Sequence, residues 1–263
     1  MNRLDFLRQL VREAGALAHT GFGSSAASLK GRHDVLTEMD GRVERHVRAA
    51  IAAAYPNDAV IGEEDGGEPG ERIWIIDPID GTANYARGIA HYCVSIGYLE
   101  GGQPVAGAIH DPSHDRLYLA QRGGGAWLSE AGQPDRRLAV SACDTLGAAT
   151  VECGWSLRRS TEDYLAMVSR VMHAGCAMRR AGSGALGLVD VAAGRIEAYA
   201  ELHINAWDCA AGVLLVEEAG GHCNDFFSAD GAGLREGNVL VATSHALAAE
   251  LERVLAIAPL RHR

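Results

Sequence analysis

Two carboxylates follow a short apolar run in the first half of the chain. Residues 73–76 are β-branched and aromatic, which is typical of a buried strand, and Asp77 comes directly after them. Pro78 cannot donate a ladder hydrogen bond, so we expect the strand to end here. Asp80 stands three residues beyond Asp77. Two anionic groups that leave a buried strand together are costly unless a cation joins them, so the segment indicates divalent-metal chemistry.

Three further acidic positions fall at predicted strand ends or helix starts. Asp40 fits a capping box with Thr37 at the start of a helix. Glu63 follows a short strand and precedes Glu64, and Asp208 heads an apolar helix. Taken alone, each has an ordinary interpretation as a helix cap or a solvated turn. Their coincidence favours one shared site, because loops and element ends gather around binding sites.

The carboxylate ligands and the residues after Asp80 indicate which metal and which reaction the site would support. Carboxylate oxygens suit Mg²⁺, Mn²⁺ or Ca²⁺ better than zinc. Gly81 and Thr82 offer backbone amides to an anion, especially if a helix begins there, and metals beside an anion site indicate phosphoryl chemistry. Aspartyl-nucleophile phosphatases of the haloacid-dehalogenase type carry D-x-D-G-T after a strand. This chain has D-x-x-D-G-T, and the extra residue disfavours that alternative.

The composition is that of an ordinary globular protein. The chain has 263 residues, 48% of them hydrophobic, and suits one large domain or two modest ones. A formal net charge of −10 argues against a non-specific nucleic-acid or anionic-membrane binder. Six scattered cysteines without a C-x-x-C pair favour reduced thiols. Because neither a signal sequence nor an apolar run of membrane-spanning length is apparent, the sequence favours a cytoplasmic protein.

The hydrophobic pattern predicts an α/β (α+β) fold in two halves. Helical spacing is found at residues 4–17 and 43–54, and short strand-like runs follow at 59–61, 73–76, 92–99, 105–110 and 117–120. Turn signals between these runs favour hairpins and an antiparallel sheet. From residue 138 onward, strands and helices alternate. The Gly-rich segment 123–137 is the expected junction, which gives halves 1–137 and 138–263.

These motifs together resemble the inositol monophosphatase family of magnesium-dependent, lithium-sensitive phosphomonoesterases. The resemblance covers nearly the whole chain. The segments that carry it are Gly62-Glu63-Glu64, residues 74–85, Trp207-Asp208 and Gly220-Gly221, with Lys30, Asp34, Thr37 and Asp40 as the family's N-terminal lysine and D-x-x-T-x-x-D segment. The resemblance implies a layered αβαβα sandwich of the sugar-phosphatase type, and usually a homodimer.

The resemblance also implies the metal ligands. Glu63, Asp77 and the carbonyl of Ile79 would hold a first Mg²⁺. A second would be held by Asp77, Asp80 and Asp208. Glu63 would help to place a weaker third ion through water. Two to three Mg²⁺ ions are therefore expected, with Mn²⁺ as a possible substitute.

The remaining implied roles concern the reaction and the substrate. Asp40, Glu63 and Thr82 would be catalytic, with Asp40 and Thr82 paired beside the attacking water. The implied mechanism is attack by metal-activated water without a covalent phosphoenzyme. The phosphate and alcohol parts of the substrate would contact Asp80, Gly81, Thr82, Gly182, Ser183, Gly184 and Glu201.

Departures from the family pattern leave the substrate open. Asn205-Ala206 stands where many inositol-specific members have His-Cys, and Gly184 replaces a frequent alanine. The expected substrate is a small phosphorylated alcohol, first inositol 1-phosphate. Histidinol phosphate, fructose 1,6-bisphosphate and adenosine 3′,5′-bisphosphate are alternatives within the family. From a different class, the protein could act as a regulatory protein-binding module, with neither nucleic acid nor membrane as its partner.

Overall fold

A computed structural model of the chain describes residues 2–23, 27–31, 34–227 and 231–256, and gives the backbone alone for 27–31 and 34–36. Within these residues the strands form a seven-stranded sheet, a five-stranded sheet and a two-stranded ribbon. The seven-stranded sheet has the order β3 (Ala59–Gly62), β4 (Arg72–Asp80), β5 (Cys93–Glu100), β6 (Gln103–Asp111), β7 (Arg116–Gln121), β8 (Gly125–Glu130) and β9 (Arg136–Arg137). It is antiparallel except for the parallel pair β3 and β4.

The second sheet comes from the C-terminal half. Its order is β11 (Ala177–Arg179), β10 (Thr150–Cys153), β12 (Ala198–Ile204), β14 (Asn238–Ser244) and β13 (Gly221–Cys223). β10 pairs in parallel with β11 and β12, whereas β14 is antiparallel to both of its neighbours. The ribbon joins β1 (Ala27–Gly31) to β2 (Asp34–Thr37). The short helices are α3 (Thr82–Tyr85), α7 (Ala232–Glu236) and a 3₁₀ turn at Leu146–Ala148.

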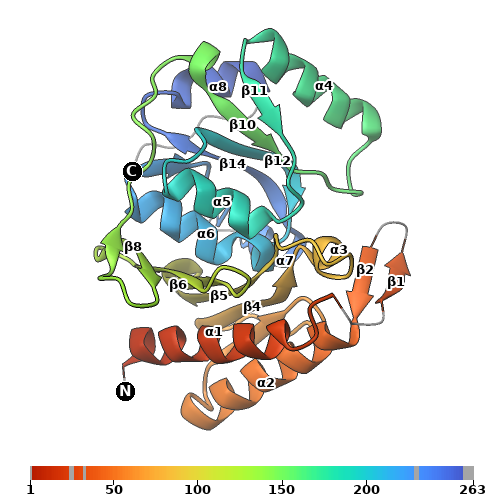
Figure 1. The fold of residues 1–263 in the computed structure, drawn as a ribbon, viewed down its shortest axis with the longest axis vertical. Coiled ribbons are helices and arrows are strands. Elements are labelled where there is room, and N and C mark those ends of the chain that lie inside the picture. Colours follow the sequence, from red (N-terminus) through yellow and green to blue (C-terminus); the bar gives the residue numbers. More distant parts are fainter. Residues whose placement is uncertain (1, 24–26, 32–33, 228–230, 257–263) are drawn as a thin grey trace.

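Helices and sheets alternate in five layers (Figure 1). Helices α1 (Arg3–His19) and α2 (Glu38–Ala54) cover one face of the seven-stranded sheet. Helices α5 (Gly184–Ala192) and α6 (Ala206–Glu218) lie between the two sheets. Helices α4 (Thr161–His173) and α8 (Ala248–Leu255) cover the outer face of the five-stranded sheet. The expected αβαβα sandwich is confirmed.

The layers follow from the burial pattern of the strands and helices. In β4, Ile73 and Ile75 face the core beneath α5 and α6, while Trp74 and Ile76 face the core of α1 and α2. A strand buried on both faces reads as a continuous apolar run rather than an alternating one. The predicted strands at 59–61, 92–99, 105–110 and 117–120 and the predicted helices at 4–17 and 43–54 are likewise confirmed.

The expected junction at residues 123–137 is wrong in part, because this segment contains β8 and β9. Ala126 and Leu128 are buried in the core under α6, so the glycines there form a turn rather than a linker. The strands of the two sheets come from opposite sides of residue 138, but α5 and α6 pack against both sheets. The division into domains 1–137 and 138–263 stays a prediction. None of the described helices is long and apolar enough to cross a membrane.

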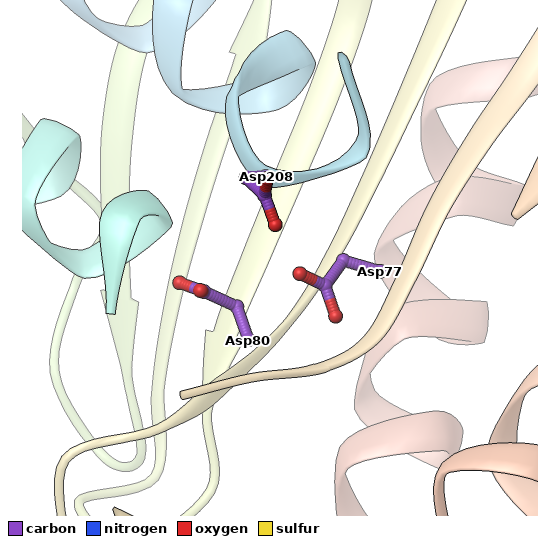
Figure 2. Close-up of side chains that lie close together, drawn as sticks. All are labelled: Asp77, Asp80 and Asp208. Carbon is purple, nitrogen blue, oxygen red and sulfur yellow. The ribbon is translucent and has the colours of Figure 1, made fainter. Parts of the chain in front are cut away.

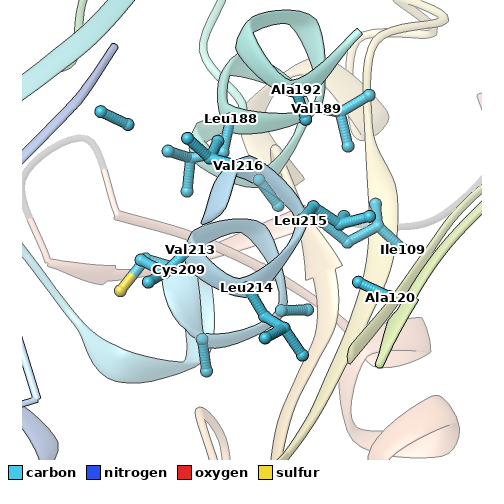
Figure 3. Close-up of a cluster of buried hydrophobic side chains, with 14 of the residues drawn as sticks. Ile109, Ala120, Leu188, Val189, Ala192, Cys209, Val213, Leu214, Leu215 and Val216 are labelled. Carbon is cyan, nitrogen blue, oxygen red and sulfur yellow. The ribbon is translucent and has the colours of Figure 1, made fainter. Parts of the chain in front are cut away.

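Helix α6 lies unusually close to the seven-stranded sheet. A Cβ atom added at Gly97 would lie 2.9 Å from Ala210 Cβ, and one added at Gly107 would lie 2.8 Å from Ala211 Cα. Figure 3 shows apolar side chains of the core around α6, among them Leu188 and Val189 from α5 and Val213 and Leu215 from α6. The small residues therefore set how closely α6, and with it Asp208, approaches the sheet.

This contact gives a stability prediction. Gly107→Val should lower the free energy of unfolding by about 2 kcal/mol, because overpacking a close contact forces backbone shifts. Urea unfolding followed by circular dichroism measures the change. Gly147→Ala is the control, since an added Cβ there meets no atom within 4 Å. Equal stability of Gly107→Val and wild type would show that α6 can move away without cost.

Candidate active site

A β-bulge in β4 brings the first two carboxylates to one face of the sheet. Asp77 pairs with Ser95 and Asp80 with Cys93, so two residues of β4 oppose a single residue of β5. In a regular strand, residues three apart point to opposite faces, and the extra residue of a bulge reverses this. The expected end of the strand at Asp77 is therefore wrong. The strand continues through the bulge to Asp80. Pro78 is tolerated there because a bulge residue need not donate to the ladder.

The third carboxylate comes from the start of α6. Asp208 closes a capping box with Asn205, whose backbone and side-chain nitrogens lie 3.1 and 3.2 Å from Asp208 Oδ2. Figure 2 shows Asp208 directed from this turn toward Asp77 and Asp80. Asp77, Asp80 and Asp208 each offer an oxygen, and these oxygens all lie within 4.8 Å of one another. Three sequence-predicted metal ligands are thus brought together.

The three carboxylates are costly to ionise in this arrangement. Burial raises the pKa of Asp77 well above its ordinary value, and the charges of Glu63, Asp80 and Asp208 raise it further. Burial and the charge of Asp80 raise the pKa of Asp208 to about 7. Asp77 Oδ1 accepts from the Ile79 amide at 3.0 Å, but Asp77 Oδ2 is buried without a hydrogen-bond partner among the described residues. Clustered carboxylates with an unsatisfied buried oxygen fit a hard divalent cation.

Asp80 is held by the start of α5. Its oxygens accept hydrogen bonds from Ser183 Oγ at 2.5 Å, the Gly184 amide at 3.2 Å and the Ala185 amide at 2.7 Å. Ser183 and Gly184, expected to face the substrate alcohol, therefore also position a carboxylate. Asp80 satisfies amides that a helix N-terminus leaves without intrahelical partners. Burial nevertheless raises the pKa of Asp80, although these hydrogen bonds oppose the shift.

Gly81 occupies a position that only glycine fits easily. Its φ of 90° is in the left-handed region, and an added Cβ would lie 3.0 Å from the His91 carbonyl oxygen. From this position it begins the short helix α3, in which the amides of Asn84 and Tyr85 bond to the Gly81 carbonyl. The amides of Gly81 and Thr82 precede any intrahelical acceptor.

Asp40 has the two contacts expected of it. It forms the capping box of α2, with the Thr37 amide 2.8 Å and Thr37 Oγ1 2.5 Å from Asp40 Oδ2. Its other oxygen lies 3.3 Å from Thr82 Oγ1, which also lies 2.8 Å from the Ile79 carbonyl oxygen. The buried Asp40 therefore links the start of α2 to the start of α3.

Glu63 lies at the edge of the carboxylate cluster rather than within it. Its amide donates to the Ile76 carbonyl at 3.2 Å, which places it beside the residue that precedes Asp77 in β4. Its side chain is not one of the three that meet within 4.8 Å, but its charge contributes to the pKa of Asp77 and it lines the same cavity as Asp80 and Asp208. The side chains of Lys30 and Asp34 lie outside the described residues.

A cavity of about 560 Å³ opens beside the cluster. Its lining includes the expected residues Glu63, Asp80, Gly182, Ser183, Gly184, Glu201 and Asp208. Other residues of the cavity wall have no role in the site predicted from the sequence; they include Glu152, Trp155, Arg158, Tyr199 and His203.

Glu201 is the most perturbed of the cavity's other acids. Tyr199 and Glu201 share one face of β12, as residues two apart on a strand do, and the Tyr199 hydroxyl donates to Glu201 Oε2. Burial, together with the charges of Asp208 and Asp80, raises the pKa of Glu201 to about 8. The alternation of residues 199 and 201 was the signal that could have identified Tyr199.

Comparisons with known proteins identify the family of the chain. A model of the inositol monophosphatase family matches residues 2–258 of the chain. A protein of Xylella fastidiosa named Nus factor SuhB is 41% identical over 204 residues, which cover 76% of this chain and 72% of that protein. An inositol-1-monophosphatase of Rhizobium meliloti is 37% identical over 252 residues, which cover 92% of each chain.

The structural comparison gives the same result. The crystal structure of extragenic suppressor protein suhB from Bartonella henselae superposes with a TM-score of 0.85 at 31% sequence identity, and the match covers 97% of this chain and 98% of that one. Sequence and fold therefore agree along nearly the whole chain. The chain belongs to the inositol monophosphatase family and is a phosphatase that hydrolyses phosphomonoesters.

Proposed function

We propose that the chain is a Mg²⁺-dependent phosphomonoesterase that acts on a small polyol phosphate, with inositol 1-phosphate as its expected substrate. The observation that carries the proposal is the meeting of Asp77, Asp80 and Asp208 within 4.8 Å. The polar cavity beside them has room for a small phosphate ester. The relative from Rhizobium meliloti, named inositol-1-monophosphatase, supports the choice of substrate.

The acidic residues would hold two to three ions. We assign Glu63, Asp77 and the Ile79 carbonyl to one Mg²⁺, and Asp77, Asp80 and Asp208 to a second. Glu63 would contact a weaker third ion through water, and Mn²⁺ could substitute because it accepts the same oxygen ligands. When bound, such ions neutralise phosphate charge and lower the pKa of water.

The chain's own residues would orient the reactants. Thr82 Oγ1 can donate its one proton to Asp40 or to the Ile79 carbonyl, which leaves its lone pairs to accept a hydrogen bond from the attacking water. The amides of Gly81 and Thr82 would bind the phosphate. With water as the nucleophile, no residue has to form a covalent phosphoenzyme.

The cavity wall would bind the alcohol part of the substrate. Gly182, Ser183, Gly184, Asp80 and Glu201 are assigned to this role, as the resemblance implies. Glu201 lines the cavity and accepts from the Tyr199 hydroxyl through Oε2, so its other oxygen would contact a hydroxyl group of the substrate. A homodimer, a cytoplasmic location and inhibition by Li⁺ complete the proposal; the homodimer and Li⁺ inhibition rest on the family resemblance alone.

The first test removes a metal ligand. Asp77→Asn and Asp208→Asn should each lower the rate of phosphate release from inositol 1-phosphate at least about 100-fold, since a metal ligand supports several kcal/mol of charge stabilisation. Phosphate release is measured with Mg²⁺ and with EDTA. Asp144→Asn, on an exposed loop, is the matched control and should behave like wild type. Full activity of both ligand variants in EDTA would contradict the proposal.

The substrate is settled by comparing values of kcat/KM. The panel contains inositol 1-phosphate, histidinol phosphate, fructose 1,6-bisphosphate and adenosine 3′,5′-bisphosphate. We expect the highest value for inositol 1-phosphate. A higher value for another ester would reassign the substrate and leave the metal site intact.

A regulatory role is the second candidate. It is favoured by the relatives named Nus factor SuhB, among them the protein of Xylella fastidiosa. We expect that Asp77→Asn, which removes a metal ligand without removing the fold, does not rescue a deletion strain if catalysis is the essential role. Rescue by this variant would favour a protein-binding role instead.

The electrostatics of the cluster predict the pH dependence of stability. The pKa of Asp208 rises from 3.8 in the unfolded chain to about 7 in the fold. A raised pKa means that the folded state binds the proton more tightly, so this contribution to stability is lost as the pH rises through about 7. Because Asp208→Asn removes the titrating group, stability in EDTA should fall less steeply with pH in this variant than in wild type.

Urea unfolding in EDTA, from pH 3.8 to above pH 7, measures the difference between wild type and Asp208→Asn. Added Mg²⁺ should stabilise wild type more at higher pH, because its ligands must be deprotonated, and should stabilise Asp208→Asn less. Parallel pH profiles of the two proteins in EDTA would contradict the assigned electrostatics.

A further inference from the structure

The loop that carries Glu63 is closed on itself. The Gly62 amide donates to the Gly66 carbonyl at 3.0 Å, and the Gly66 amide donates back to the Gly62 carbonyl at 3.1 Å. The Glu63 amide is bonded to the carbonyl of Ile76, the residue before Asp77. The position of Glu63 relative to the metal cluster is therefore set by this short turn.

A buried carboxylate on α2 accepts hydrogen bonds from the turn. Glu44 is fully buried. Its Oε2 accepts from the Glu64 amide at 2.8 Å, and its Oε1 accepts from the Asp65 amide at 3.1 Å. These are the two amides that follow Glu63, so Glu44 holds the chain immediately after the proposed ligand.

Arg48 completes the arrangement. Its Nε donates to Glu44 Oε1 at 2.8 Å, which pairs the buried charge. Its Nη2 donates to the Gly66 carbonyl, and its Nη1 lies 3.4 Å from the Val60 carbonyl oxygen. Only Glu44 is buried, since the Arg48 side chain stays partly exposed. The guanidinium and the two amides together offset the desolvation cost of the buried carboxylate. The pair therefore fastens both ends of the turn to α2.

The fit between the turn and Glu44 is close. A Cβ atom added at Gly62 would lie 2.2 Å from Glu44 Oε1 and 2.7 Å from Oε2. Only glycine at this position lets the carboxylate reach the amides. Asp40 lies one helical turn before Glu44, on the same face of α2. One helix thus presents a carboxylate to Thr82 and another to the loop of Glu63.

We propose that Glu44 is a positioning residue that sets the metal affinity of the site by holding the Glu63 loop, an inference that rests on the proposed function. Loss of one carboxylate oxygen leaves the amide of Glu64 or that of Asp65 without its buried acceptor, and the loop must then be ordered when the metal binds. That ordering cost weakens metal binding. Once a saturating metal concentration has ordered the loop, Glu63 is in place and catalysis proceeds.

The test is Glu44→Gln, which keeps the shape of the side chain. Its NH₂ group cannot accept a hydrogen bond from either amide, and Arg48 loses its anionic partner. Calorimetric titration with Mn²⁺ in the absence of substrate should show a Kd at least about tenfold higher than that of wild type. At saturating Mg²⁺, kcat should stay within about threefold of wild type. A role limited to folding would lower Tm without changing the Kd of the folded protein.

Controls separate the outcomes. Glu38→Gln removes an exposed carboxylate from the same helix and should bind Mn²⁺ like wild type. If Glu44→Gln does not fold, Arg48→Gln replaces it, and a smaller rise in Kd is expected. An unchanged Kd in the folded variant overturns the role of Glu44 alone. Failure of wild type to bind Mn²⁺, or unchanged binding by Asp77→Asn, overturns the proposed metal site itself.

Discussion

Mutual repulsion among Asp77, Asp80 and Asp208 is the constraint on which the rest of the structure depends. Carboxylates whose oxygens lie within 4.8 Å of one another would separate if their backbones allowed it. The bulge in β4 fixes two of them, and the start of α6 fixes the third. Both α5 and α6 direct their N-terminal ends to this cluster, where the partial positive charge of a helix N-terminus favours anions. The fold therefore offsets part of the repulsion before any cation binds.

The layered packing makes this placement rigid. Helices α5 and α6 lie between two sheets, so neither can tilt away from the cluster without opening an apolar core (Figures 1 and 3). Glycines at the points of closest approach remove the side chains that would hold α6 further from β5 and β6. At Gly212 an added Cβ would lie 2.5 Å from Leu188 Cδ1, so a side chain of α5 packs directly against the backbone of α6 there. Small residues thus let the layers pack closely, and this packing fixes the distance between Asp208 on α6 and the acids on β4.

The sequence predicts most of the elements and places the three clustered acids at element ends, but it does not predict how these acids meet. The apolar run before Asp77 predicted its strand, and a helical pattern predicted α6 behind Asp208, because both depend on local spacing. The bulge was not predictable, since it arises from the pairing of β4 with β5 rather than from β4 alone. The sequence does not reveal β8, because the glycines beside residues 126 and 128 outweigh a short strand signal and indicate a junction instead.

The burial of Glu44 is a second feature that the sequence pattern does not predict. Glu44 lies between the core residues Val43 and Val47, where a single charged residue on an amphipathic helix is ordinarily solvated. Its burial depends on a turn that follows it by about twenty residues, and on the absence of a side chain at Gly62. The resemblance identified the acids of the cluster but not the partners that hold them, which for Asp80 are Ser183 and Ala185.

The hydrogen bonds of the cluster also divide the carboxylate oxygens between the protein and a cation. Asp80 accepts three hydrogen bonds from the start of α5, which occupy both of its oxygens. The two bonds to Asp208 fall on Oδ2 alone, and Asp77 uses only Oδ1. An ionised carboxylate has about four acceptor positions. Hydrogen bonds from the protein use the most of these positions in Asp80 and the fewest in Asp77. Asp77 Oδ2, buried and unbonded among the described residues, is therefore the oxygen for which a cation would compensate most.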